Sequence, residues 1–337
     1  MARSLALVAL ALLCACAPRA VGGVQSAPLD PASVLGGTVA IDLPDYEDID
    51  LAADDHTLAT VIRTHGASAL LVTDLGTRQT RTIPTTAGRD VLLAAGGAVR
   101  GDLVAYAERE DLGGRSIMWH VIVADLRGGT RELDAIPSEL SDDPTGRFAP
   151  AAITNGHDVV WMRAPIVEGR LGNAQVVRWD GEATTLVYRG QARFGMDDDG
   201  RIAIARPTGA PDALATWELL LFDGGAAKTI ARRAGGGAPS VHGSSIAWPR
   251  IAYASSTIDI VDIASGGTRP ITQQGCLSVG AAVSVAVFLC AEQRSRVVPL
   301  DARTVIDSAG VFLRADPHAI IGRDVKEGRW TVTPVAN

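Results

Sequence analysis

The sequence predicts an all-β fold in which four-stranded sheets repeat along the chain, and three observations support this. Short apolar triplets recur at steps of 34 to 55 residues, from Leu58-Ala59-Thr60 to Ala319-Ile320-Ile321. A turn of Asp, Asn or Gly precedes most of them, and an alternating strand that often ends in Asp follows after a loop. No stretch of a dozen residues carries a helical apolar stripe. A repeat of this kind is typical of the blades of a β-propeller.

Within each unit, the triplet is interpreted as the second strand and the Asp-ending segment as the third. Packing the sheets radially buries both of their apolar faces, so the inner strands can be apolar and small. The triplets begin at Leu58, Val104, Val159, Ile202, Ile246, Val285 and Ala319. The third strands end at Asp74, Asp125, Asp180, Asp223, Asp262 and Asp301.

The number of blades follows from the two ends of the repeat. After the last triplet, Gly328–Val335 supplies a third strand and leaves no room for a fourth. Gly37–Leu43 lies before the first blade and has no partner there. We expect this segment to add the missing outer strand and close the ring, which leaves only short edges exposed. We favour seven blades, with six as the alternative.

Three consecutive carboxylates, Asp197, Asp198 and Asp199, precede Gly200 and raise the question of a calcium site. Calcium takes six to eight oxygen ligands, usually from alternating positions plus a distant carboxylate. Adjacent side chains at a hairpin corner point in different directions, and the corresponding corners of other blades carry no acidic triplet. We therefore interpret the segment as the turn between the first and second strands of one blade.

The same stretch carries a family resemblance. "DDDGRIAIA" followed by "ELLLFDGGAAKTI" resembles the TolB-like, WD40-like propeller repeat, and Ser240–Thr272 matches it as well. As a pattern the resemblance covers most of residues 45–335, and it implies the propeller fold over residues 37–337. The motifs are not specific, so the resemblance implies little about function.

The N-terminus is typical of an exported lipoprotein. Arg3 and the apolar run Leu5–Leu13 predict a signal peptide over residues 1–15. Leu13-Cys14-Ala15-Cys16 resembles the bacterial lipobox and predicts acylation of Cys16. Residues 16–36 are rich in Pro, Ala, Gly and Ser and predict a flexible, lipid-anchored tether. Plain secretion, with cleavage after Ala17, and an uncleaved anchor are the alternatives.

Two cysteines are left once Cys14 and Cys16 are assigned to the leader and the anchor. Cys276 and Cys290 flank two short apolar runs that should form a hairpin and place them opposite each other. In an oxidising compartment outside the cytoplasmic membrane they can form a disulfide. The alternative is two separate buried thiols.

The composition disfavours several classes of function. The net charge is −7 and no segment carries a basic cluster, so we expect no nucleic-acid partner. The six histidines lie in different parts of the repeat, and we expect those at blade corners to splay apart as surface or turn residues. No Cys or His spacing is typical of zinc, and no serine lies in a nucleophile elbow. The histidines are His56, His65, His120, His157, His242 and His318.

A candidate ligand rim remains. Arg89, Arg147 and Arg193 each stand at the start of an innermost strand, and in a propeller these positions surround one mouth of the central channel. Three guanidinium groups there could hold an anionic ligand or an acidic loop of a partner. The alternative is solvated rim arginines in a chain whose basic residues are nearly all arginine.

Together these features predict a monomeric lipoprotein, anchored through Cys16 on the outer side of the cytoplasmic membrane or elsewhere in the cell envelope. We expect a non-catalytic binding or scaffold module for an envelope protein or a glycan, without a cofactor. The alternatives are a metal-dependent lactonase or lyase with a site in the central channel, and a sensor domain of an envelope complex. The enzyme would need carboxylates or histidines on several innermost strands, where Ala, Gly, Val and Phe predominate.

Overall fold

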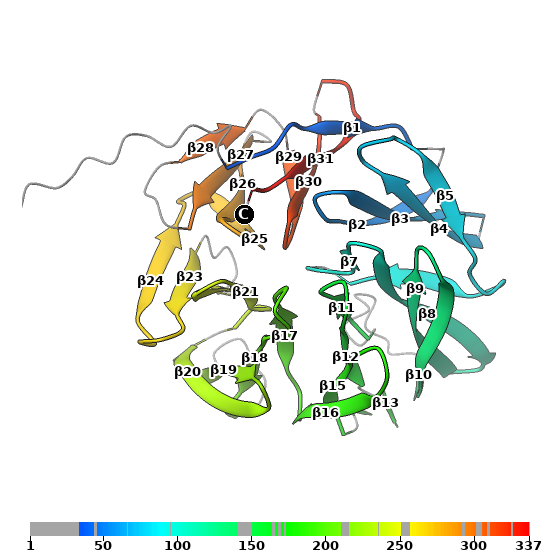
Figure 1. Cartoon of the computed structure of the whole chain (residues 1–337), viewed down its shortest axis with the longest axis horizontal. Helices are drawn as coiled ribbons and strands as arrows, with labels where there is room; N and C mark the ends of the chain where they lie inside the picture. The colour runs from blue at the N-terminus through cyan, green and yellow to red at the C-terminus, as the bar shows by residue number, and fades with distance from the viewer. Residues whose placement is uncertain are drawn as a thin grey trace, which may run out of the picture.

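The protein folds as a ring of seven four-stranded sheets around a central axis (Figure 1). The computed structural model describes residues 34–336 except 44–45, 66, 95, 140–149, 164–165, 168–169, 172, 210–215, 235, 251–256, 292–293, 301–304, 309–310 and 325. Every element named in the described part is a β-strand. That part contains no helix with the length and apolar character that a membrane crossing requires. The all-β, seven-bladed prediction is confirmed, and the six-bladed alternative is set aside.

The strands of each blade are given from the axis outward. Blade 1 comprises β2 (Asp48–Ala53), β3 (Thr57–Thr64), β4 (Ala67–Asp74) and β5 (Thr80–Ile83). Blade 2 comprises β6 (Asp90–Leu93), β8 (Leu103–Gly113), β9 (Ser116–Asp125) and β10 (Gly129–Glu139), with β7 (Val99–Arg100) paired to β8. Blade 3 comprises β11 (Ala152–Thr154), β12 (Val159–Arg163), β15 (Gln175–Trp179) and β16 (Thr184–Arg189), with the hairpin β13 (Ile166–Val167) and β14 (Arg170–Leu171) between β12 and β15.

The remaining four blades follow the same order. Blade 4 comprises β17 (Arg193–Met196), β18 (Ile202–Pro207), β19 (Thr216–Asp223) and β20 (Ala226–Ala234). Blade 5 comprises β21 (Ser240–His242), β22 (Ser245–Pro249), β23 (Thr257–Asp262) and β24 (Thr268–Thr272). Blade 6 comprises β25 (Cys276–Ala282), β26 (Val285–Cys290), β27 (Arg294–Pro299) and β28 (Ile306–Ser308). Blade 7 comprises β29 (Val311–Asp316), β30 (Ala319–Arg323), β31 (Trp330–Pro334) and β1 (Val39–Ile41).

The two ends of the described chain close the ring in blade 7, beside each other in Figure 1. Strand β1 runs antiparallel to β31, with Val39 opposite Val332 and Ile41 opposite Trp330. An isolated bridge from Leu35 to Val335 continues the pairing. The predicted closure by Gly37–Leu43 is therefore present, with β1 as its strand. The signal peptide over residues 1–15, Cys16 and nearly all of the tether lie outside the described residues.

The hydrophobic core lies between neighbouring blades. Val72 of blade 1 and Val104 of blade 2 belong to one buried cluster, and Leu219 of blade 4 and Trp248 of blade 5 belong to another. All seven predicted triplets are second strands, and their residues are almost completely buried. Small residues such as Ala59 leave room for the facing sheet, so burial of aliphatic side chains on both faces stabilises the ring.

Four of the third-strand aspartates accept backbone hydrogen bonds in the turns that follow their strands, namely Asp74, Asp125, Asp180 and Asp262. Asp301 lies outside the described residues. Oδ1 of Asp74 accepts a hydrogen bond from the backbone N of Thr77 at 2.7 Å, and Oδ1 of Asp262 accepts one from Ser265 N at 2.7 Å. These hydrogen bonds lower the pKa of both carboxyl groups below the ordinary value. Aspartate favours such positions because its side chain reaches the backbone two or three residues further along.

The ring has two different faces. The turns between first and second strands open on one face, which we call the corner face. The first strands begin at the other face, which we call the loop face, and the turns between second and third strands lie there too. Because each first strand runs from the loop face to the corner face, side chains far apart in sequence meet around the axis at each face.

Candidate functional site

The Asp197–Asp199 segment forms the turn between β17 and β18 at the corner face, as predicted. Its three carboxylates point to different partners. Asp197 accepts hydrogen bonds from the backbone N and the Nε of Arg201, at 2.8 and 2.7 Å. Asp198 reaches toward the ring axis, whereas the Asp199 side chain is 83% exposed. Among the described residues no group of three or more His, Cys, Asp or Glu side chains is placed to hold a metal ion.

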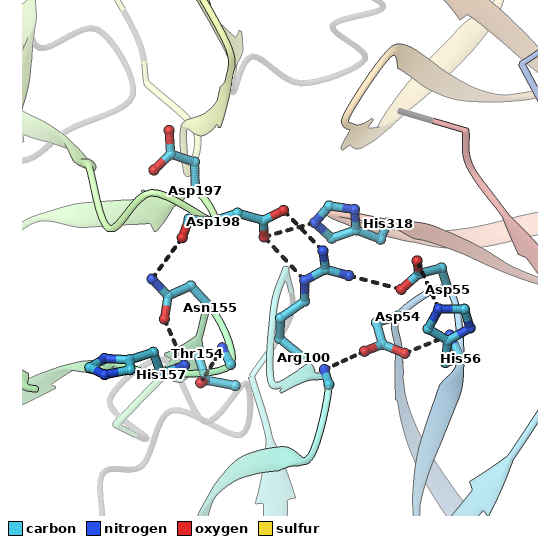
Figure 2. Close-up of polar contacts among 12 residues, drawn as sticks. Asp54, Asp55, His56, Arg100, Thr154, Asn155, His157, Asp197, Asp198 and His318 are labelled. Atoms are coloured by element: carbon cyan, nitrogen blue, oxygen red, sulfur yellow. Dashed lines mark hydrogen bonds and ion pairs between the residues drawn. The ribbon is translucent and has the colours of Figure 1, made fainter. Parts of the chain in front are cut away.

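Asp198 bridges the ring across its axis (Figure 2). Its Oδ1 lies 3.0 Å from Nε2 of His318, which stands at the corner of blade 7. The same carboxylate accepts two hydrogen bonds from Arg100 of blade 2, from Nε at 3.1 Å and Nη2 at 3.0 Å. We call Arg100, Asp198 and His318 the bridge cluster. The hydrogen bond with His318 is the main cause of an Asp198 pKa below the ordinary value.

An insertion in blade 2 brings Arg100 to the axis. Between β6 and β8 the chain forms the short strand β7, which points toward the centre of the ring in Figure 1. Gly97 has a φ of +121°, and a Cβ there would contact Ile153 and Pro317 at 3.6 Å. Glycine is therefore needed for the backbone conformation, whereas the space would accept a Cβ in ordinary contact. The insertion packs between blades 3 and 7 and carries Arg100 beyond its own blade.

Blade 1 holds the other side of Arg100. The Nη1 group of Arg100 donates to Oδ1 of Asp55 at 2.8 Å. The neighbouring Asp54 accepts a hydrogen bond from the backbone N of Gly101, and this fixes the end of the insertion. Burial raises the Asp54 pKa, although three backbone N–H groups oppose that shift. Corners of blades 1, 2, 4 and 7 thus converge in one polar network.

This convergence corrects the expectation that the corner histidines splay apart. The expectation holds for His56 and His157, whose side chains are mostly exposed, but it is wrong for His242 and His318, which are both buried beside the same hollow. His318 is 4% exposed and meets a carboxylate 120 positions away in the sequence. Blades 4 and 7 lie on opposite sides of the ring, and closure brings their corners together across the axis. The Pro317-His318 corner gives no sequence signal that could reveal this contact.

His242 is the second buried histidine of the corner face. It is the last residue of β21, and its Nε2 lies against Oγ of Ser240. Burial lowers the His242 pKa to about 3, with a smaller contribution from the nearby His318. The imidazole is therefore neutral at physiological pH. It acts as a hydrogen-bonding group there, not as a charge or a general base.

A hollow of about 250 Å³ opens beside the bridge cluster. Its polar wall contains the three aspartates of the β17–β18 turn, Arg201, His242 and His318. Its apolar wall contains Met196, Val241, Val283 and Pro317. Nδ1 of His318 is buried and has no hydrogen-bond partner among the described residues. Figure 2 shows this nitrogen turned away from Asp198 and Arg100. The hollow thus combines apolar surface, carboxylates and an unpaired nitrogen.

The predicted arginine rim lies at the loop face, and the two described members have partners within the chain. Arg89 contacts Glu110 at 2.6 Å and the buried Glu108 at 3.4 Å. Arg193 donates to the carbonyl of Gly236 at 2.7 Å and lies over the ring of Trp217. Arg147 lies outside the described residues. A ligand bound by this rim stays a prediction.

The predicted pair of cysteines also lies at the loop face. Cys276 begins β25 and Cys290 ends β26, and the two residues stand directly opposite each other in the sheet. A disulfide joins them across 14 positions of sequence. It fastens the two innermost strands of blade 6 at the end away from the hollow.

Comparison with known proteins finds similar folds but no similar sequences. No family model and no curated protein matches the sequence. The β-propeller domain of the Trilobed protease from Pyrococcus furiosus is 11% identical with a TM-score of 0.58, and the match covers 86% of this chain and 94% of that one. That domain is described as having an open velcro topology, whereas β1 completes blade 7 here.

Two further solved structures are similar at low identity. The Pyrococcus horikoshii acylaminoacyl peptidase is 11% identical with a TM-score of 0.56 over 81% of this chain, which spans about half of the peptidase (48%). TolB from Acinetobacter baumannii is 15% identical with a TM-score of 0.45, over 85% of this chain and 65% of that one. At such identities the likeness shows the fold alone. The chain is a seven-bladed β-propeller.

Proposed function

We propose that the protein is a lipid-anchored, extracytoplasmic propeller that binds an envelope protein or glycan without catalysing a reaction, and that the corner face carries the binding site. The observation that carries this proposal is the bridge cluster beside the hollow. Arg100, Asp198 and His318 come from three blades and hold one another in place. A site fixed in this way loses little conformational entropy when a partner binds.

The path of the N-terminal chain supports the same face. Strand β1 is entered from the corner face, where Val34 accepts a hydrogen bond from Ala336 N at 2.9 Å. Eighteen positions separate Cys16 from Val34. A flexible chain of this length spans about 25 Å on average. Acylation of Cys16 would therefore keep the corner face near the membrane, within reach of a membrane-associated partner.

In-cell crosslinking tests this proposal. A photoreactive amino acid replaces Ser244, which is exposed in the β21–β22 turn beside Gly243 of the hollow, or Asp307 on the outer strand of blade 6 as the matched control. We expect position 244 to capture a defined envelope component and position 307 to capture none. We expect Cys16→Ser to release the protein from the membrane fraction and to reduce capture.

Two results would contradict the proposal. Equal capture from both positions, or from neither, would remove the corner face as the binding site. Stoichiometric calcium or zinc in the purified protein, together with metal-dependent turnover, would favour the enzyme alternative.

A further inference from the structure

The hollow at the corner face has a definite chemical character, and this limits what it can bind. Its polar side presents carboxylates and two imidazoles, and its other side is formed by Met196, Val241, Val283 and Pro317. At about 250 Å³ it is smaller than the usual site for a drug-sized ligand. It therefore has room for a single side chain or another small group, and not for a folded segment.

The charges of the described corner-face network are unbalanced. The carboxyl groups of Asp54, Asp55, Asp158, Asp197, Asp198 and Asp199 stand there with the guanidinium groups of Arg100, Arg178 and Arg201. These carboxyl groups outnumber the guanidinium groups by two to one. Such an arrangement attracts a cation and disfavours an anion.

Most of these carboxylates accept close hydrogen bonds from arginine or backbone groups, whereas Asp199 has only a distant arginine neighbour. Arg201 is its one ionic neighbour among the described residues, at 3.9 Å. That arginine already binds Asp197 at 2.6 Å and donates to the Gly243 carbonyl at 2.7 Å. Asp199 therefore keeps acceptor capacity at the edge of the hollow.

A second, independent observation comes from the buried wall. His318 is 4% exposed, and Asp198 accepts the hydrogen bond of its Nε2. In the tautomer that carries its proton on Nε2 and donates it to this carboxylate, Nδ1 is an acceptor. This nitrogen has no partner among the described residues. A buried acceptor without a donor is costly, and a bound N–H group would satisfy it.

We propose that the hollow takes a lysine side chain of a partner protein, an inference that rests on the proposed binding function. The alkyl stem lies along the apolar wall and the ammonium group approaches Asp199 and the His318 side. Lysine fits better than arginine because a guanidinium fork seeks a carboxylate that it can bind bidentately. Asp198 is the carboxylate so placed, and Arg100 already occupies it. A neutral sugar would leave the charge of Asp199 uncompensated.

A small amine tests the inference on the purified full-length protein. The probe is Nα-acetyl-lysine N-methylamide, and binding is followed by the NMR shifts of the amides of residues 199–201 and of the His318 ring nitrogens. We expect a Kd of about 1–10 mM, as is usual for a ligand of this size. Asp199→Asn should weaken binding at least five-fold, and Asp307→Asn should leave it unchanged.

Uncharged probes provide the controls. The Nε-acetylated form of the same compound keeps the stem but loses the positive charge, and methyl glucoside represents a glycan. Neither should shift the His318 Nδ1 resonance. Equal binding of the acetylated probe, equal binding to Asp199→Asn, preferential binding of the glucoside, or no binding of the amine would each overturn the inference.

Failure of the inference is distinguishable from failure of the proposed function. If position 244 captures an envelope protein in cells while the amine probe does not bind, the corner face is a binding site that does not take lysine. If position 244 captures nothing while the amine binds, the hollow holds ammonium groups but the proposed partner function is wrong.

Discussion

The two faces of the ring use the same kinds of side chains in different ways. At the corner face, Arg100, Asp198 and His318 join blades on opposite sides of the axis. At the loop face, Arg89 and Glu108 join the beginning and end of neighbouring strands in a single blade, and the disulfide does the same in blade 6. This ion pair and this disulfide at the loop face are therefore local, whereas the bridge cluster at the corner face depends on the closed ring.

This difference separates contacts that stabilise one blade from contacts that position groups around a binding site. Ion pairs within one blade hold adjacent strands in register, and their loss affects folding first. The bridge cluster is partly exposed and adds less to stability, yet it fixes groups from several blades around a hollow. We therefore expect loop-face substitutions to change stability and corner-face substitutions to change binding.

Glu108→Ala should have the largest effect on stability. The Glu108 side chain is almost completely buried, and it accepts hydrogen bonds from Thr86 N at 3.0 Å and from Arg89 at 3.4 Å. Its removal leaves these donors without their buried acceptor, which lowers the free energy of unfolding by about 3–4 kcal/mol. Denaturant unfolding measures the change. Asp307→Ala, which removes an exposed ion pair, should cost less than about 1 kcal/mol, and equal effects would contradict the account.

Loss of the disulfide should come next. Replacement of both Cys276 and Cys290 by Ser removes a link that closes a loop over 14 positions. In the chain-entropy model such a loop contributes about 3 kcal/mol. Thermal unfolding should show the decrease, and binding at the corner face should be unchanged. A variant as stable as the parent would show that the link adds nothing.

The buried His242 should make stability depend on pH. Burial depresses its pKa to about 3, so between pH 6.5 and 3 the unfolded chain binds a proton that the folded ring does not. Stability therefore falls as the pH decreases, by about 2 kcal/mol from pH 7 to pH 5. His242→Phe should reduce this slope, whereas His65→Ala, at an exposed position, should retain it. Denaturant midpoints measured at several pH values show whether the slope of stability with pH depends on His242.

The bridge cluster should have the smallest effect on stability. Arg100→Ala removes hydrogen bonds to Asp198 and Asp55, both partly exposed, and should cost about 1 kcal/mol. Because the Asp198 pKa is lowered in the fold, its contribution is present above the unfolded pKa and is lost as the pH falls through the folded pKa. Arg100→Ala should nevertheless abolish most capture from position 244. Unchanged capture would show that the bridge cluster is not needed for binding.

The sequence predicts much of the fold because the fold depends on local patterns. The triplets, the turns before them and the unpaired Gly37–Leu43 segment indicate seven blades and their closure without any long-range information. The hairpin β25–β26 likewise predicts the neighbouring positions of Cys276 and Cys290. These features lie within one blade or at the ends of the repeat.

The candidate site was not predictable in the same way. Asp198 and Arg100 are 98 positions apart, and their contact requires both ring closure and the β7 insertion. The acidic triplet is recognisable in the sequence as a turn. The contacts of Asp198, however, depend on partners in other blades. The arginine rim was inferred from residue type and strand position, and neither reveals that Glu108 and Glu110 stand beside Arg89.

The central claim is that the partner binds the corner face. Hydrogen exchange of the full-length protein, alone and with the component captured from position 244, tests it most directly. We predict slower exchange at residues 197–201 and 317–318, and no change at residues 89–93 and 276–278 on the loop face. Protection of the loop-face segments with unaltered exchange at the corner face would contradict the account.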